Sequence, residues 1–432
     1  MKRPSLSLKT FHSCAAWTLA VFALSLSLAA ASAAQTQSIL YSFTNTTDGA
    51  VPGSGLISDA AGNLYGTAQY SSPGQGVVFR LSPSAGGGWT ETVLYTFSGS
   101  LDGGNPYGGV AIDASGNLYG TTPYGGSANC GVVYKLKPRP IAPWKESVLH
   151  AFRCHADGAN PITPLVLDSS GNIYGTTVYG GNTTTGSGTA FELSPTSTGM
   201  YKETLLHTFQ GKADGSLPFA GLTLDSAGNL YGTTVAGGST ACSGGCGVVF
   251  ELSKSSGVWN FKTLHQFRYG DGWAPEALLT IDSAGNLYGT TEVGGPINNG
   301  GNGYGVVFEL SPNGAGGWTE KTIYAFTGGA DGSASRSPVI FDSAGNLYGA
   351  NSGVPSYFGT IFKLTPDGSG GWIESNLYDW SNSTYYQGAT PIGPIVRDAA
   401  GNIYGTNEFG GATAYEFCIQ GDGCGTVFEV TP

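Results

Sequence analysis

The sequence predicts an all-β fold, a seven-bladed β-propeller whose blades are four-stranded sheets. The segment Gly-Asn-Leu/Ile-Tyr-Gly recurs seven times, at intervals of 54 to 60 residues. Each copy contains four short apolar runs separated by glycine-rich turns, and no window has the 3.6-residue period of an amphipathic helix. Because one such sheet cannot bury both faces alone, the copies are expected to pack around a ring. The motif asparagines are Asn63, Asn117, Asn172, Asn229, Asn286, Asn346 and Asn402.

The fourth copy shows the expected parts of one blade. Residues 218–225 form the first strand and residues 229–234 its hairpin partner, while residues 247–253 and 259–267 supply the third and fourth strands. In propeller repeats with a similar strand–Gly-Asn–strand core, such as NHL repeats, the strand before the turn lies innermost. By analogy, we expect the same order here.

An aspartate stands three residues before each Gly-Asn pair. A short carboxylate accepts backbone N–H bonds within a turn, and glycine supplies the positive φ of a tight hairpin. A calcium site is the alternative for carboxylates in such a register, but each of these belongs to a separate blade, so turns are expected. The seven residues are Asp59, Asp113, Asp168, Asp225, Asp282, Asp342 and Asp398.

The two ends of the repeat array are expected to meet in one blade. Residues 39–43 match the fourth strand of the other copies, and residues 425–430 match the third. The N-terminal strand should therefore complete the seventh blade, made otherwise of residues 391–430. Such a closure leaves no open sheet edge in the ring.

Residues 1–34 are expected to lie outside the propeller, which takes residues 35–432 as one domain. Three basic residues precede an uncharged apolar stretch at 15–31, and small residues suited to cleavage follow. This pattern is typical of a secretory signal peptide, and the apolar stretch is shorter than the ~20 residues of a membrane-spanning helix. An uncleaved membrane anchor is the alternative. We expect a secreted, periplasmic or extracellular monomer without a membrane span.

The charge of the chain excludes one class of partner. The net charge is -11 at pH 7, and removal of the three basic residues within the first 34 would make it -14. An acidic surface repels phosphate backbones, so nucleic-acid binding is not expected.

The motif DxxGNLYGTTxxGG, followed by GVVFELSP and by a WxExxLYxF stretch, resembles the Gloeo_Verruco (GloVer) tandem repeat of exported bacterial proteins. The resemblance covers nearly all of residues 38–432. It implies export and a repeat fold, but it implies no reaction. Some relatives carry a C-terminal sorting or anchoring signal, and the lack of one here favours release from the cell.

Six cysteines follow residue 34, an even number that favours disulfides in an exported chain. Two pairs lie within single loops, and antiparallel pairing should bring the third pair together between the third and fourth strands of one blade. Zinc is the alternative, but no histidine accompanies the pairs at zinc-finger spacing. The expected disulfides are Cys130–Cys154, Cys242–Cys246 and Cys418–Cys424.

The histidines argue against catalysis. His150, His207 and His265 share a position that carries tyrosine in other copies, which indicates packing in the outer strand. Only His155 falls outside the pattern. A histidine-dependent nucleophile or a multi-histidine metal centre is therefore not expected, and no catalytic or metal-binding residue is assigned. Tryptophans that begin the fourth strand are expected to pack between blades: Trp89, Trp144, Trp259, Trp318 and Trp372.

Ligands of propellers usually bind where the loops between strands two and three and between blades converge on the channel. One position in these loops is aromatic in four copies that are consecutive around the ring, which predicts an arc suited to sugar rings or peptide side chains. The alternative is that each ring covers its own loop. The candidate binding residues are Tyr70, Tyr124, Tyr179 and Phe409, together with Trp273 from an inter-blade loop. The other copies carry Ala236, Val293 and Gly353 at the arc position.

The inter-blade loops also contain polar residues that break the repeat, namely Arg153, Lys212, Arg268, Glu276 and Arg336. An Asp-Gly turn recurs there at Asp48, Asp102, Asp157, Asp214, Asp271 and Asp331, with Gln387 in the last copy. No cofactor is expected; calcium bound by carboxylate and carbonyl oxygens in the channel mouth is the alternative.

These observations favour a binding or scaffold propeller for a glycan, a cell-wall polymer or a protein. The alternative is a divalent-ion-dependent enzyme of the lactonase or lyase kind. An enzyme requires repeat-breaking polar residues clustered at one channel mouth, and along the sequence such residues are few and scattered.

Overall fold

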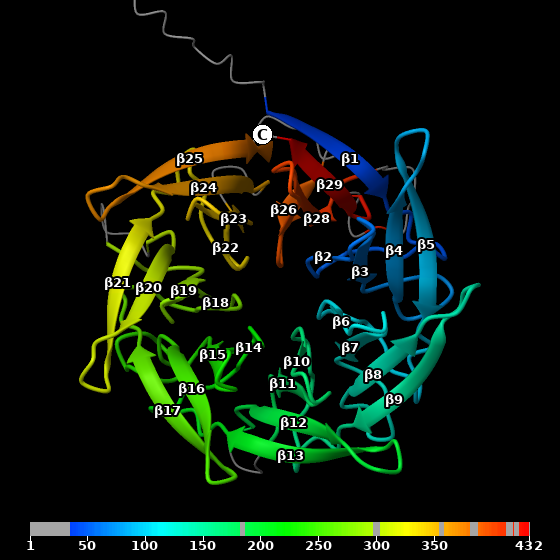
Figure 1. Ribbon diagram of the computed structural model, residues 1–432, viewed down its shortest axis with the longest axis horizontal. Helices are drawn as coiled ribbons and strands as arrows, with labels where there is room; N and C mark the ends of the chain where they lie inside the picture. Colours follow the sequence, from blue (N-terminus) through cyan, green and yellow to red (C-terminus); the bar gives the residue numbers. More distant parts are fainter. Residues whose placement is uncertain are drawn as a thin grey trace, which may run out of the picture. The chain divides into compact units, whose positions relative to one another are not determined.

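Seven antiparallel sheets stand around a central channel in the computed structural model of the protein (Figure 1). The structure describes residues 35–181, 186–296, 303–353, 358–380, 388–411, 418 and 423–431. No α-helix occurs in these ranges, and none of their segments is a helix able to cross a membrane. The seven-bladed propeller predicted from the repeat is confirmed. The signal-peptide prediction for residues 1–34 and the Gln387 position lie outside the described residues.

Each blade contributes one strand to each of four concentric layers. The innermost strands are β2 (Ile57–Ser58), β6 (Ala111–Ile112), β10 (Val166–Leu167), β14 (Leu222–Leu224), β18 (Thr280–Ile281), β22 (Ile340–Phe341) and β27 (Val396–Arg397), with β26 (Ala389–Pro391) also paired in blade seven. The second strands are β3 (Leu64–Ala68), β7 (Leu118–Thr122), β11 (Ile173–Thr177), β15 (Leu230–Thr234), β19 (Leu287–Thr290), β23 (Leu347–Asn351) and β28 (Ile403–Phe409).

The third strands are β4 (Val77–Pro83), β8 (Val132–Lys137), β12 (Thr189–Pro195), β16 (Val248–Ser255), β20 (Val306–Pro312), β24 (Thr360–Pro366) and β29 (Thr426–Thr431). The outer strands are β5 (Trp89–Thr96), β9 (Lys145–Ala151), β13 (Tyr201–Thr208), β17 (Val258–Gln266), β21 (Trp318–Ala325), β25 (Trp372–Asp379) and, in blade seven, β1 (Thr36–Ser42). The strand before the Asp-containing turn is innermost, as predicted.

Blade seven is built from both ends of the chain. Strand β1 pairs antiparallel with β29, so that Ile39 lies opposite Phe428 and Ser42 opposite Thr426 (Figure 1). Phe43, which follows β1, is fully buried and its ring packs edge-on against Phe79 of blade one, 5.1 Å between centroids. The predicted closure is confirmed, and it removes the open edge that β29 would otherwise present.

The aspartate of each repeat holds the turn between the first two strands. In blade one, Asp59 Oδ1 accepts the backbone N–H groups of Ala61 and Asn63, both at 2.9 Å. Its Oδ2 accepts the Asn63 side-chain amide at 2.7 Å and the Tyr65 hydroxyl at 3.0 Å. The tyrosine–aspartate bond recurs in all seven blades. The turn role predicted for these aspartates is confirmed.

The last glycine of the motif is required because the third strand approaches it closely. A Cβ on Gly66 would lie 2.6 Å from Cζ of Phe79, which is fully buried across the sheet. The Phe79 ring can therefore lie over the second strand only because the facing residue, Gly66, has no side chain.

The motif tyrosine also forms the contact between blades. The Tyr65 ring packs against Trp144 of the next blade, with 6.5 Å between ring centroids. The same arrangement joins Tyr174 to Trp259 at 6.0 Å, and it recurs at Tyr231–Trp318 and Tyr404–Trp89. The prediction that these tryptophans pack between blades is confirmed.

The predicted disulfides are present. Cys130–Cys154 joins the start of β8 to the segment after β9, with 5.3 Å between Cα atoms. Cys242–Cys246 and Cys418–Cys424 close single loops, with Cα separations of 5.1 and 5.0 Å.

At the outer edge of several blade interfaces, a partly buried glutamate of one blade lies near an aspartate of the loop that precedes that blade. At the first of these interfaces the Tyr41 hydroxyl donates a hydrogen bond to Asp48 at 3.0 Å, and Glu91 of blade one is the glutamate close to Asp48. Burial and the negative charge of Asp48 raise the pKa of Glu91 to about 7. Burial and the charge of Asp102 raise the pKa of Glu146 to about 7 in the same way.

We predict that Phe43→Ala destabilises the protein by about 3–5 kcal/mol, because it leaves a cavity at the junction of blades seven and one. Ile39→Ala is the matched control, since Ile39 lies on the same end of the chain but is 37% exposed. Denaturant unfolding measures both. An equal loss of stability in the two variants would contradict the claim that the buried Phe43 ring at the junction of blades seven and one stabilises the closed propeller.

We predict that Glu91→Gln and Glu146→Gln each stabilise the protein at pH 8, on the order of 1 kcal/mol. A carboxyl whose pKa rises on folding contributes stability that is complete below pH 4.5 and is lost as the pH passes 7. The neutral amide avoids this loss, so the gain should nearly vanish at pH 5. Thermal unfolding at the two pH values is the measurement, and an equal gain at both would contradict the assignment.

Candidate functional site

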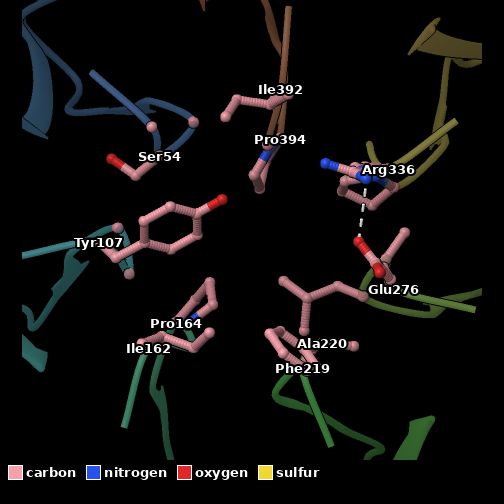
Figure 2. A pocket seen from close by; sticks show the side chains of 18 residues that line it. Ser54, Tyr107, Ile162, Pro164, Phe219, Ala220, Glu276, Arg336, Ile392 and Pro394 are labelled. Atoms are coloured by element: carbon pink, nitrogen blue, oxygen red, sulfur yellow. Dashed lines mark ion pairs between the residues drawn. The ribbon is translucent and has the colours of Figure 1, made fainter. Parts of the chain in front are cut away.

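One residue from each blade, just before its innermost strand, reaches the central channel. Together with neighbouring backbone these residues line a hollow of about 620 Å³ of atom-free space, part of which is open to solvent (Figure 2). The seven residues are Gly53, Tyr107, Ile162, Phe219, Glu276, Arg336 and Ile392. Every blade therefore contributes to this one hollow.

The polar side chains of the hollow form a charged cluster with their neighbours. Arg336 Nε lies 3.3 Å from Glu276 Oε2, and an Arg336 terminal nitrogen contacts Glu292 Oε1 directly. The negative charge of Glu408 acts on both Arg336 and Tyr107. Figure 2 shows the Tyr107 hydroxyl directed into the channel, opposite the Glu276–Arg336 ion pair.

Three carboxylates around one guanidinium leave this cluster negative. Burial and the charge of Glu292 raise the pKa of Glu276 to about 7, although Arg336 opposes the shift. Burial and the nearby Glu408 raise the pKa of Tyr107 to about 12. Glu276 can therefore exchange a proton near neutral pH, while Tyr107 remains a hydrogen-bond donor.

The remaining wall of the hollow is apolar. Ile162, Pro164, Phe219 and Ile392 line it (Figure 2), and Leu278 adds to the same lining. A ligand in this hollow would meet hydrophobic surface on one side and hydrogen-bonding groups on the other, which is typical of small-molecule sites.

The interpretation that repeat-breaking polar residues are scattered was wrong for Glu276 and Arg336. They come from different blades, but equivalent positions of all blades converge at the ring axis. The sequence reasoning missed Tyr107, Glu292 and Glu408. The sequence did contain a signal for the two glutamates. Glu292 and Glu408 each stand one residue before the arc position of their blade, at the place that Gln69 takes in blade one.

The predicted arc residues occupy one backbone position. Tyr70 forms an isolated antiparallel bridge with Ala50, Tyr124 with Gly104, and Tyr179 with Ala159. Phe409 ends β28 and pairs with Ala389.

The exposure of the arc residues is unequal. Tyr70, Tyr124 and Tyr179 are 42%, 49% and 48% exposed, whereas Phe409 is half-buried. Trp273 is also half-buried and packs against Tyr269, with 5.9 Å between ring centroids. Three of the five candidates thus present their rings to solvent.

The arc lies on the same face as the channel hollow. The second strand of each blade runs antiparallel to the first, so it ends beside the point where the first begins. In blade one, Gln69 at the end of β3 reaches Gly53 at the channel, because a Cβ on Gly53 would lie closest to the Gln69 amide. Tyr70 also lines a second hollow with Thr44, Gln75 and Cys418.

Groups of three metal-ligating side chains occur elsewhere. Within the ranges that the structure describes, two such groups have all ligand atoms within 4.8 Å of one another. They are His150, Asp157 and Glu203, and His265, Asp271 and Glu320. Both groups lie at the outer strands and not at the channel mouth, where calcium held by carboxylate and carbonyl oxygens stays an untested alternative.

The family model of the Gloeobacter/Verrucomicrobia repeat matches residues 25–244, 143–301 and 240–432. None of the curated proteins gives a significant match. A crystal structure of a protein from Lactobacillus plantarum is similar over 80% of this chain and 88% of its own, with a TM-score of 0.53 and 16% identity. A structure described provisionally as a gluconolactonase has 13% identity and a TM-score of 0.39, over 80% of this chain and 95% of its own. At such identity the first likeness concerns the fold alone.

We predict that Arg336→Met destabilises the protein at pH 8 by about 1–2 kcal/mol, because it leaves three carboxylates without their cation. Protonation of Glu276 relieves the repulsion, so the loss should shrink as the pH falls from 8 to 5. Thermal unfolding of the variant and of Arg268→Met, which alters an exposed arginine outside the cluster, measures this. A loss that does not depend on pH would contradict the electrostatic explanation.

Proposed function

The chain belongs to the Gloeobacter/Verrucomicrobia repeat family, and we propose that it acts as a binding propeller that holds a carbohydrate polymer across one face of its ring. The observation that carries the proposal is the row of exposed rings of Tyr70, Tyr124 and Tyr179 on three consecutive blades. The disulfides are typical of an oxidising compartment, so we include export in the proposal.

The three tyrosines are suited to stacking on sugar rings. Antiparallel bridges fix their backbones, so little conformational entropy is lost when a ligand packs on them. A ring that is about half exposed can offer one face to the apolar side of a pyranose while its hydroxyl bonds to water or to the ligand. Equivalent positions in consecutive blades repeat around the face, which suits a ligand that itself repeats.

The channel hollow supplies a second kind of contact on the same face. Glu276, Glu292 and Arg336 are held by one another, so their remaining donors and acceptors are oriented before a ligand arrives. Such groups suit vicinal hydroxyls better than phosphates, because the cluster is negative overall. A neutral saccharide therefore fits both parts of the face.

The test begins with a glycan and polysaccharide array, and the ligand found there is then titrated. We predict that Tyr70→Ala combined with Tyr124→Ala weakens binding at least tenfold, since each platform contributes on the order of 1 kcal/mol. Folding should change little because both rings lie in solvent-exposed loops.

Two controls accompany this variant. Tyr304→Ala removes a tyrosine of similar exposure, 45%, from a blade outside the arc and should leave the affinity unchanged. Ala236→Tyr extends the arc into blade four and should not abolish binding. The proposal fails if the double variant keeps its affinity, or if protein ligands bind and no saccharide does.

One observation favours a second candidate, a lactonase- or lyase-like enzyme. The raised pKa of Glu276 places a carboxyl in the channel hollow that can donate or accept a proton at neutral pH. Assay of a panel of lactones and uronate polymers, with and without calcium, tests this candidate. Turnover that Glu276→Gln abolishes would support it, and turnover unaffected by that change would eliminate it.

A further inference from the structure

Two blade interfaces carry a histidine, an aspartate and a glutamate in close contact near the outer wall. At the first, His150 lies one residue before the end of β9, Asp157 lies in the following loop, and Glu203 comes from β13 of the next blade. His150 Nε2 lies 3.4 Å from Asp157 Oδ2 and 3.8 Å from Glu203 Oε2. At the second, His265 Nε2 lies 3.2 Å from Asp271 Oδ2, and Glu320 completes the group.

The imidazole Nε2 atoms of these groups face carboxylate oxygens without making a well-aligned hydrogen bond. His150 Nε2 and His265 Nε2 are shielded from solvent, and neither has a hydrogen-bond partner in the protein. Glu203 Oε1 is also buried and unpartnered, but so is Glu146 Oε1 at a tyrosine interface, so the imidazole nitrogen is the atom that distinguishes the histidine groups. Buried polar atoms normally find partners, so each imidazole nitrogen points to a ligand that it shares with the carboxylates of its own group.

Other blade interfaces show how the repeat satisfies the same position without such a ligand. Where tyrosine replaces histidine, its hydroxyl donates to the loop aspartate, as Tyr95 does to Asp102 at 3.1 Å. At the His207 interface the glutamate is replaced by Phe261, whose ring stacks on the imidazole at 3.8 Å. Among the described interfaces, the full set of three ligands occurs only where histidine and glutamate coincide.

The donor set indicates the class of cation. One imidazole nitrogen with two carboxylate oxygens suits zinc and its first-row neighbours, and leaves a fourth position for water. Calcium and magnesium prefer oxygen ligands alone.

We propose that the protein binds two zinc-type divalent cations at its outer wall, one held by His150, Asp157 and Glu203 and the other by His265, Asp271 and Glu320. Each ion ties two consecutive blades together, because the glutamate belongs to the blade after the histidine. The first site is the weaker one, since Arg153 already donates to Asp157 Oδ2 at 3.0 Å.

The test uses the purified protein without an affinity tag, stripped of metal with a chelator and titrated with zinc. Calorimetry and elemental analysis should give close to two equivalents, and saturating zinc should raise Tm. His150→Tyr and His265→Tyr should each remove one equivalent and keep the fold, because tyrosine occupies this position in other blades. Phe261→Glu should add a third equivalent by completing the ligand set around His207 and Asp214.

Cobalt as a spectroscopic probe distinguishes this proposal from binding by thiolates. The expected spectrum has d–d bands without the near-ultraviolet thiolate charge-transfer band, since the described cysteines are paired in disulfides. Less than half an equivalent of zinc would overturn the proposal. So would two equivalents that survive both histidine substitutions, or a folded Phe261→Glu variant with no added site.

Discussion

The tyrosine of the Gly-Asn-Leu/Ile-Tyr-Gly segment connects the turn inside a blade to the packing between blades. In blade one, the Tyr65 hydroxyl is held by Asp59 and its ring packs against Trp144 of the next blade. A tilt of one blade against its neighbour would therefore disturb a buried ring contact and a charge-assisted hydrogen bond together. Since all seven blades use the same tyrosine–aspartate bond, this unit sets the angle between blades and hence the channel that they surround.

Within this frame, two positions on the channel face vary widely from blade to blade. The channel position can be Gly53 in one blade and Arg336 in another, because its side chain borders the hollow and is outside the hydrophobic clusters between the blades. The residue type at the arc position can also change, because only the backbone of this residue is held, by a β-bridge to the loop that precedes the blade. The face is consequently divided, with exposed tyrosines over blades one to three and the acidic cluster around Arg336 over blades five to seven. A symmetric scaffold thus presents an asymmetric surface.

Features that depend on local chemistry or on the repeat could be predicted from the sequence. The turn role of Asp59, the Cys242–Cys246 pair and the closure by residues 39–43 each follow from neighbouring residues or from alignment of the copies. Proximity between blades could not be predicted in the same way. Glu292 and Arg336 are 44 residues apart, and their contact depends on the ring geometry. His150 was correctly assigned to an outer strand by its exchange with tyrosine, but that reasoning did not reveal Glu203 of the next blade beside it.

The pairing of Thr36 with Thr431 joins residues that are almost the whole length of the domain apart. Contacts of such sequence separation are the costliest to form early, because the intervening chain must first be ordered. Strand β1 therefore has no strand partner until β29 is available, and before then only blades one to six can assemble, as an open arc. This delay keeps the ring from closing until the segment that forms β29 has been made. The order of strands in blade seven thus couples the last step of folding to the arrival of the last residues.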